Sequence, residues 1–132
     1  MMMTKAGRRG FSLVELMITV AIIAILSAIG LTTYTNAQKR SRDARRQADI
    51  QSVRSALELY RADNPSTGYP AASYAGLCCD PGEPLVGYLS ELPLDPTNSG
   101  TYVYTYSGGG TTYTLTADME KLLPDPYSVG PP

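Results

Sequence analysis

An apolar run from Phe11 to Leu31 constrains this chain more than any other feature of its sequence. The run has 21 residues and contains a single charged residue, Glu15. As a helix that rises about 1.5 Å per residue, it would reach roughly 31 Å, which matches the hydrocarbon thickness of a bilayer. A carboxylate inside lipid costs about 2.5 to 3.5 kcal/mol on insertion scales and is usually paired. The sequence therefore predicts one membrane-spanning helix whose Glu15 needs a cationic partner.

A short basic leader precedes this run and ends in a glycine, Gly10, directly before Phe11. The leader contains three basic residues, which are Lys5, Arg8 and Arg9. The junction GFSLVEL, with Glu15 as the fifth residue after it, resembles the prepilin signal of type IV pilins and of the pseudopilins of type II secretion systems. The resemblance implies that a prepilin peptidase cuts between Gly10 and Phe11 and that Phe11 is then N-methylated. It also implies that Glu15 meets the N-terminal ammonium of a neighbouring subunit in a helical filament, which supplies the missing cation.

The leader and the length of the run bear on where the chain resides. A secretory signal usually has an apolar region of about 7 to 15 residues, so this run is too long for one. Three bases precede the run and five follow it between Lys39 and Arg46, so charge alone favours the opposite orientation. The prepilin resemblance overrides that count, because its peptidase acts on the cytoplasmic side. We therefore expect a single pass through a bacterial cytoplasmic membrane with the N-terminus in the cytoplasm, and later an extracellular or periplasmic filament.

The helical pattern continues beyond the run, with neither proline nor glycine from residue 32 to residue 64. Small residues recur at helical spacing between Ala37 and Ala48, and larger apolar residues follow between Val53 and Tyr60. We expect one continuous stripe, whose small part admits another helix and whose large part lies on a sheet. From Phe11 to Tyr60 such a helix would be about 75 Å long, so half of it must pack outside its own domain.

Charge is distributed unevenly along the chain. Residues 1–46 carry a net charge of +6 and residues 47–132 carry −7. A basic band beside the membrane and an acidic head would suit contacts between neighbouring subunits, and solvation of both surfaces is the alternative. The band at Lys39 to Arg46 has no interleaved aromatic residue and is interrupted by Asp43. We therefore favour contacts between subunits or with solvent, then lipid headgroups, and last DNA.

The head begins with an irregular segment. Residues 64–84 are rich in Pro, Gly and Ser and predict a loop. Residues 85–96 have room for only one or two helical turns, with four apolar side chains available to the core: Leu85, Tyr88, Leu89 and Leu92. This segment and the strands that follow resemble the C-terminal region of small pilins and of major pseudopilins. The tail from Leu122 contains four prolines in 11 residues and should be extended or disordered.

An alternating pattern predicts a β-hairpin between the loop and the tail. Thr101–Ser107 and Thr111–Ala117 alternate, and three consecutive glycines, Gly108 to Gly110, allow a reversal between them. The first strand places three tyrosines on one face, which are Tyr102, Tyr104 and Tyr106. We expect these rings to form the core against the helix, or to lie half-exposed on the fibre surface.

Few residue types here support chemistry. The chain has no histidine, which excludes imidazole metal ligands and histidine acid-base catalysis. Cys78 and Cys79 are adjacent, so they make no zinc pattern and cannot staple a loop. We expect a packing role for them, with free thiols or a bond to another subunit as alternatives. Some pseudopilins hold calcium beside this hairpin, and the candidate oxygen ligands here are Asp95, Asp118 and Glu120. No DxDxDG spacing is present, and for Asp95 a turn before Pro96 is the favoured role.

The combined prediction is an α+β protein of the pilin type. It comprises a leader at residues 1–10, a membrane and filament-core helix at 11–31, an amphipathic half of the same helix at 32–63, and a head at 64–132. The head should be a small antiparallel sheet of three or four strands. The expected function is that of a non-enzymatic pilus subunit that forms a homo-oligomeric filament with the help of prepilin peptidase and an assembly machinery. The alternatives are a major pseudopilin of type II secretion and, from another class, a single-span anchored binding protein.

Overall fold

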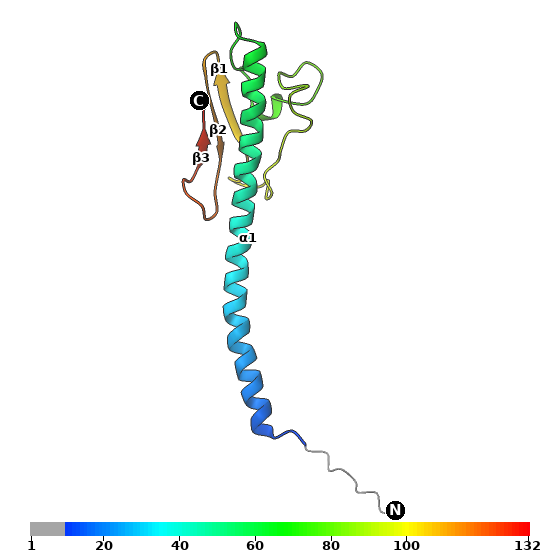
Figure 1. Ribbon diagram of the computed structural model, residues 1–132, viewed down its shortest axis with the longest axis vertical. Coiled ribbons are helices and arrows are strands. Elements are labelled where there is room, and N and C mark those ends of the chain that lie inside the picture. The colour runs from blue at the N-terminus through cyan, green and yellow to red at the C-terminus, as the bar shows by residue number, and fades with distance from the viewer. Residues whose placement is uncertain (1–9) are drawn as a thin grey trace, which may run out of the picture. The chain divides into compact units, whose positions relative to one another are not determined.

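The computed structural model describes residues 10–132, in which two helices and three strands form (Figure 1). The bounds are α1 Leu13–Asp63, the short 3-10 helix η1 Tyr74–Gly76, β1 Thr105–Gly109, β2 Thr112–Ala117 and β3 Tyr127–Val129. Residues 1–9 of the predicted leader lie outside the described residues. Contacts divide the chain into two compact units at Asn36 and Ala37, within α1. The two units are therefore described separately.

The long helix that the sequence predicts is confirmed as one continuous element of 51 residues, Leu13–Asp63. No proline interrupts its hydrogen-bond ladder, and the single glycine, Gly30, is accommodated as a helical residue. The helix ends as expected at the turn formers, where the Asn64 N–H donates to the Tyr60 carbonyl at 2.9 Å. Pro65 follows directly and prevents the helix from continuing.

The sheet has three antiparallel strands in the order β1-β2-β3. The predicted hairpin is confirmed, but its first strand begins at Thr105 rather than Thr101, and two of the three glycines belong to it. Gly109 pairs with Thr112, so the reversal is made by Gly110 and Thr111, with Gly110 at a positive φ of 64°. A Cβ at Gly108 would collide with the Tyr106 ring, which explains a glycine inside the strand.

The third strand comes from the tail, which the sequence predicted to be extended or disordered. Tyr127–Val129 pairs with the second half of β2, from Leu115 to Ala117, and so completes the free edge of that strand. The Gln51 amide donates to the Tyr127 hydroxyl at 2.7 Å and ties β3 to α1. Of the two predicted alternatives, the extended one is confirmed for Tyr127–Val129. Its pairing was not predicted, because composition does not reveal that the β2 edge offers hydrogen-bond partners.

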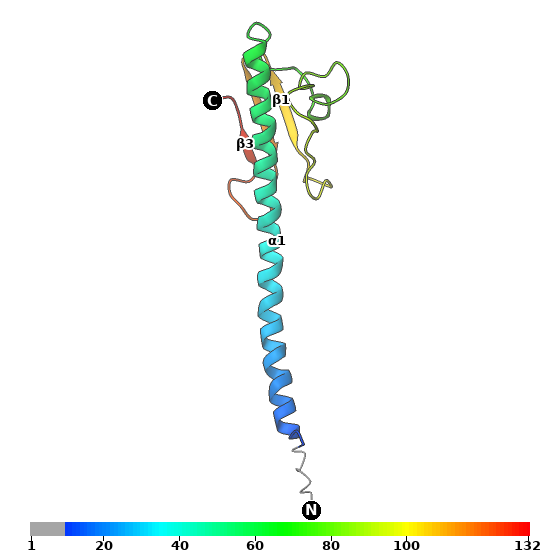
Figure 2. The same cartoon turned by 45° about the vertical axis from the view of Figure 1, so that its right-hand side comes forward.

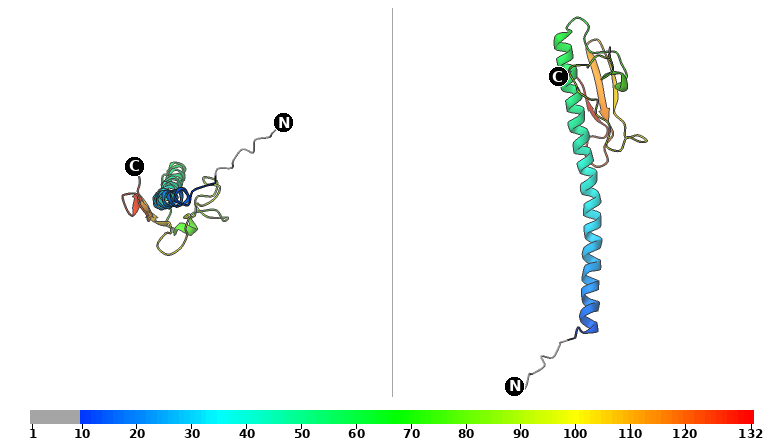
Figure 3. Two further views of the ribbon diagram at one scale, coloured as in Figure 1. Left: turned by 90° about the horizontal axis from the view of Figure 1, so that it is seen from below. Right: turned by 90° about the vertical axis from the view of Figure 1, so that its right-hand side faces the viewer.

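The core of the head lies between one face of α1 and one face of the sheet, which lies on a single side of the helix (Figure 3, right). The helix contributes Ile50, Val53, Ala56 and Leu57, all at most 2% exposed. The sheet and the segment before it contribute Tyr104, Tyr106, Tyr113, Leu115 and Ala117. Two of the three predicted tyrosines are therefore core residues, whereas Tyr102 is half-buried and lies beneath an arginine.

The buried face of α1 differs from the stripe that the sequence predicted. Ala37, Ser41, Ala44 and Ala48 are exposed. The buried face instead continues from Ile50 towards the N-terminus through Arg46 and Asp43, at steps of four and three residues. The large part of the predicted stripe is confirmed, because Val53, Ala56 and Leu57 are buried. The continuity of the stripe is wrong, because the buried face continues through paired charged residues rather than through the small ones, which are left exposed as they would be for contact with another helix.

The irregular segment after α1 is confirmed and contributes to the core through Tyr69, Leu77 and Leu85. Figure 2 shows this segment looping out beside β1, on the side of the helix away from β3. It is joined to the hairpin tip, because the Tyr69 N–H donates to the Gly110 carbonyl at 2.7 Å. Gly68 has a positive φ of 75°, and a Cβ there would collide with Gly110.

The two cysteines form a disulfide with each other. Free thiols and a bond to another subunit, the two alternatives weighed from the sequence, do not occur in the structure. The bond joins adjacent residues, so it closes no loop and restricts the unfolded chain little. Cys78 is buried beside the core, in agreement with the expected packing role.

Candidate functional site

The N-terminal part of α1 leaves its large apolar side chains exposed. Between Phe11 and Leu31 these side chains are 52% exposed at Ile22, the least exposed, and 81% exposed at Phe11, the most exposed. An 18-residue window of α1 has a mean hydropathy of 2.5, enough to cross a membrane, and none of it is buried. An apolar surface of this extent requires lipid or other protein to cover it.

The one carboxylate of this segment caps the helix that carries it. The Ser12 N–H donates to Oε2 of Glu15 at 3.1 Å, while the Ser12 carbonyl accepts the first helical bond from Leu16 at 3.2 Å. The S-x-x-E spacing is that of a capping box, so Glu15 has a role within its own helix that the sequence analysis did not predict. A negative charge in the first turn is also stabilised by the helix dipole. Gly10 and Phe11, the predicted cleavage junction, are both exposed.

A second group of polar residues lies in the compact unit of residues 37–132, to which the term head refers from here on, and is centred on Arg46, whose side chain is fully buried. Its Nε and Nη2 donate to the two carboxylate oxygens of Asp95 at 2.6 and 3.1 Å. Its Nη1 donates to Asp43 at 2.7 Å and to Glu120 at 3.1 Å, and Nη2 donates also to the Thr97 hydroxyl at 3.1 Å. We call Arg42, Asp43, Arg46, Asp95 and Glu120 the arginine cluster.

Asp43 extends the arginine cluster to the backbone after β2. Its carboxylate accepts the N–H groups of Glu120, Lys121 and Leu122 at 2.9, 2.7 and 2.9 Å. Glu120 in turn accepts two bonds from the Arg42 guanidinium, both at 2.6 Å. Among the described residues, no buried side-chain nitrogen or oxygen lacks a partner. The loop after β2 is therefore fixed to α1 by charge-assisted hydrogen bonds.

The arginine cluster keeps its acids ionised. Burial opposes the ionisation of Asp43, but three backbone N–H groups and Arg46 outweigh it, so its pKa lies below the ordinary value of 3.8. Burial likewise opposes ionisation of Asp95, and bonds from Arg46 and the next two backbone N–H groups lower its pKa. The bonds from Arg42 lower the pKa of Glu120. In return, the bond to Asp95 raises the pKa of Arg46.

The three calcium candidates do not come together as a metal site. Asp95 and Glu120 bind Arg46, whereas Asp118 lines a separate shallow pocket with Thr101 and Asp125. Among residues 10–132 no group of three acids or cysteines has the arrangement to hold a metal ion. The carboxylate oxygens of Asp95 and Glu120 already accept hydrogen bonds from arginines, so these residues do not fit the ion.

The basic band divides into two groups. Arg42 and Arg46 point into the arginine cluster, whereas Arg40 and Arg45 are exposed. Arg45 is 69% exposed and lies 3.9 Å from Asp49, a loose surface pair. The sequence indicated a surface band interrupted by Asp43, and it did not predict that Asp43 and Arg46 are buried. The signal that could have found them is their spacing, which continues the buried positions of α1.

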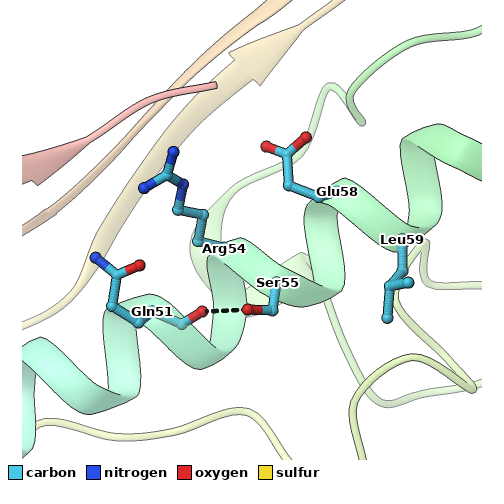
Figure 4. A pocket seen from close by; sticks show the side chains of 5 residues that line it. All are labelled: Gln51, Arg54, Ser55, Glu58 and Leu59. Atoms are coloured by element: carbon cyan, nitrogen blue, oxygen red, sulfur yellow. Dashed lines mark hydrogen bonds between the residues drawn. The ribbon is translucent and has the colours of Figure 1, made fainter. Parts of the chain in front are cut away.

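A shallow pocket of about 520 Å³ lies along α1, lined by Gln51, Arg54, Ser55, Glu58 and Leu59 (Figure 4). The Ser55 hydroxyl donates to the Gln51 main-chain carbonyl at 2.9 Å. The carboxylate of Glu58 accepts the hydroxyls of two core tyrosines, Tyr69 and Tyr113, at about 3.0 Å. Glu58 therefore binds α1 to the core tyrosines, whereas the Ser55 bond lies within α1.

Family comparisons agree with the resemblance at the junction. Residues 5–31 match the prokaryotic N-terminal methylation motif, and residues 33–119 match the model for protein G of the type II secretion system. The first match contains Gly10, Phe11 and Glu15. No solved structure matches the chain significantly.

Curated relatives fall into two groups. The type II secretion system core protein G of Pseudomonas aeruginosa is 30% identical over 133 residues, covering 90% of each chain. The type IV wide pilus major component of Thermus thermophilus is 33% identical over 112 residues, covering 83% of this chain and 82% of its own. A type IV major fimbrial protein of Dichelobacter nodosus is 29% identical over 125 residues, covering 83% and 78%. The signal at the junction, the α+β fold and these matches together show that the chain belongs to the family of type IV pilins and type II secretion pseudopilins.

Proposed function

We propose that this chain is the structural subunit of a type IV pilus-like filament, cut between Gly10 and Phe11 and methylated on Phe11. The observation that carries the proposal is the exposed apolar surface of α1 between Phe11 and Leu31. Lipid covers this surface before assembly, and the helices of other subunits cover it afterwards. Because that exchange replaces one apolar environment with another, shape fit and polar pairs must determine the register.

Glu15 supplies the polar pair at the end of that surface. Among residues 10–132 the carboxylate accepts only the Ser12 N–H, which leaves acceptor capacity for a cation. Cleavage before Phe11 creates an ammonium group, and in the filament this group belongs to the neighbouring subunit. The partners are accordingly prepilin peptidase, the assembly machinery and copies of the same chain. The subunit waits in the cytoplasmic membrane with its N-terminus in the cytoplasm, and it acts without catalysis or a cofactor.

Processing tests this proposal directly. Mass spectrometry of the mature protein should give a polypeptide that begins with N-methylated Phe11. Gly10→Ala should leave an uncut precursor and abolish fibres, whereas Gly7→Ala, in the same leader, should be processed normally. A mature protein that retains its first ten residues would contradict the proposal.

A major pseudopilin of type II secretion is the second candidate, and the match of residues 33–119 to the protein G family favours it. The two functions differ in what loss of the gene removes. Electron microscopy of sheared fibres from cells with and without the gene would show a lost surface fibre for a pilus subunit. For a pseudopilin the surface fibres would remain and secreted proteins would accumulate in the periplasm.

A further inference from the structure

Three segments that are distant in the sequence meet at the Arg46 guanidinium. Asp43 lies on α1 itself, Asp95 lies in the loop before β1, and Glu120 follows β2. Sequence separations of 49 and 74 residues are bridged by the bonds from Arg46 to Asp95 and Glu120. The side chains of Asp43, Arg46 and Asp95 are fully buried, and that of Glu120 is 9% exposed. The guanidinium is therefore the point at which helix and loops are joined.

All the hydrogen-bonding capacity of Arg46 is used. A guanidinium carries five N–H donors, one on Nε and two on each Nη. The structure gives one bond from Nε, two from Nη1 and two from Nη2. The Tyr102 ring lies over the guanidinium, with Cζ 4.7 Å from the ring centroid, and covers its face. Every N–H donor of the buried guanidinium is therefore used, and none is left for water or another ligand.

Oxygen donors from separate loops that surround one buried positive charge are the usual arrangement of a structural metal ion. Here the charge is covalently part of α1. Calcium would need six to eight oxygens at about 2.3 to 2.6 Å, and the oxygens of Asp43 and Asp95 already accept N–H groups. We propose that Arg46 takes the place of a structural cation, so that the head folds and keeps its loops ordered without calcium. This inference concerns the head alone and does not depend on the filament function.

The first test needs no variant. The full chain in detergent micelles is unfolded by heat and followed by circular dichroism, once with millimolar calcium and once with excess EGTA. We expect the same Tm in both conditions. Terbium, a calcium substitute that neighbouring tyrosines such as Tyr102 sensitise, should give no saturable luminescence. A Tm that falls in EGTA and returns with calcium, or saturable terbium emission, would overturn the proposal.

The second test removes the charge. Arg46→Met keeps much of the side-chain volume but leaves two buried acids without their cation, so we expect Tm to fall by about 10 °C or more. The matched control is Arg45→Met, the exposed neighbour, whose Tm should stay within about 2 °C of the parent. Equal Tm values for the Arg46→Met and Arg45→Met proteins would contradict the proposal.

Two milder variants keep the test informative if Arg46→Met does not fold. Thr97→Val removes one of the five guanidinium bonds and leaves every charge in place, so its Tm should fall by a few degrees. Arg46→Lys keeps the charge but offers three donors on a single atom. The Tm of the Arg46→Lys protein should therefore lie between the Tm values of the parent and of the Arg46→Met protein. A Tm unchanged by both variants would show that the guanidinium bonds do not hold the loops.

Discussion

The exposed part of α1 and the head differ in how their carboxylates are paired. In the exposed part, Glu15 accepts one N–H from the described part of its own chain, and the surrounding apolar side chains are exposed. In the head, Asp43 accepts three backbone N–H groups and a guanidinium, and the surrounding side chains face inward. Under the proposed function, other molecules complete the first arrangement, whereas the second is complete within one chain. The proposal thus assigns the charge of Glu15 to assembly and the charges of the arginine cluster to stability.

This comparison implies that assembly and head stability can be separated by mutation. A change near Glu15 should affect filaments and leave the unfolding of the head unchanged. A change near Asp43 should destabilise the head and leave membrane insertion unchanged. The predictions below test this separation, beginning with the largest expected effect.

Glu15→Gln should abolish most filament formation. A glutamine still accepts the Ser12 N–H but cannot neutralise an ammonium group. The variant therefore removes the charge of residue 15 and keeps its capping hydrogen bond. A loss of about 1.4 kcal/mol per subunit contact already weakens association tenfold. The yield of sheared fibres, measured by immunoblot, should therefore fall at least about tenfold. The head of the Glu15→Gln protein should unfold at the same temperature as that of the parent. A normal yield of fibres would contradict the proposed pairing of Glu15 with the ammonium group.

Asp43→Ala should destabilise the head by about 3 to 5 kcal/mol. It removes the acceptor of three backbone N–H groups and leaves Arg46 with a buried bond unmade. Urea unfolding of the full chain in micelles measures the loss. Asp80→Ala, an exposed acid in the loop, is the control and should change stability by less than about 0.5 kcal/mol. Both proteins should enter membranes normally, and failed insertion of the Asp43→Ala protein alone would break the separation.

The contrast between the regions also explains how far the sequence could predict the structure. Helix length, the hairpin and the tyrosine core follow from local rules: an apolar run, an alternating pattern and the absence of proline. The junction residues Gly10, Phe11 and Glu15 are recognisable because their signal lies in a few consecutive positions. The family matches confirm the resemblance that these positions carry.

The arginine cluster could not be predicted in the same way. Its members come from residues 42–46, 95 and 120, and their pairing depends on how the loops return to the helix. Composition assigns arginine and aspartate to the surface, because isolated buried charges are costly. Only the complete set of partners makes burial favourable, so Asp95 and Glu120 looked like metal ligands while their cation lay on α1.

Acid should destabilise the head and spare the membrane helix. The folded-state pKa values of Asp43, Asp95 and Glu120 lie below the ordinary 3.8 and 4.5, so near pH 4 the unfolded chain binds more protons than the folded one. The stability that these three ionised carboxylates contribute is complete at pH values above their ordinary pKa values. It is lost as the pH falls through their lower pKa values in the folded state. The free energy of unfolding, measured between pH 7 and pH 3, should show this decline. The decline should be smaller in the Asp95→Asn protein. Helix content in micelles should persist at low pH, because the apolar run of α1 has no such network.

The smallest predicted effect is the difference in stability between the loss of a buried tyrosine hydroxyl and the loss of an exposed one. Tyr104 donates to Asp49 at 2.8 Å, and burial, followed by this bond, raises the pKa of Tyr104 above its usual value. Tyr104→Phe should cost about 1 to 2 kcal/mol in the free energy of unfolding. Tyr127→Phe loses an exposed bond with Gln51 and should cost less than about 0.5 kcal/mol. Equal costs would mean that the tyrosine hydroxyls of the core contribute no more than those at its edge.

The bond between Tyr69 and Gly110 has a practical consequence for labelling the protein. A hairpin tip is often chosen as the place for an affinity tag, but here it is held against the segment that follows α1, where Gly68 leaves no room even for a methyl group. A peptide inserted after Gly110 would pull the reversal away from its neighbour. The exposed bend at Asp80 to Gly82 has no such constraint, since a Cβ on Gly82 would meet no atom within 4 Å. An epitope placed there would let antibodies follow the subunit without loosening the strands.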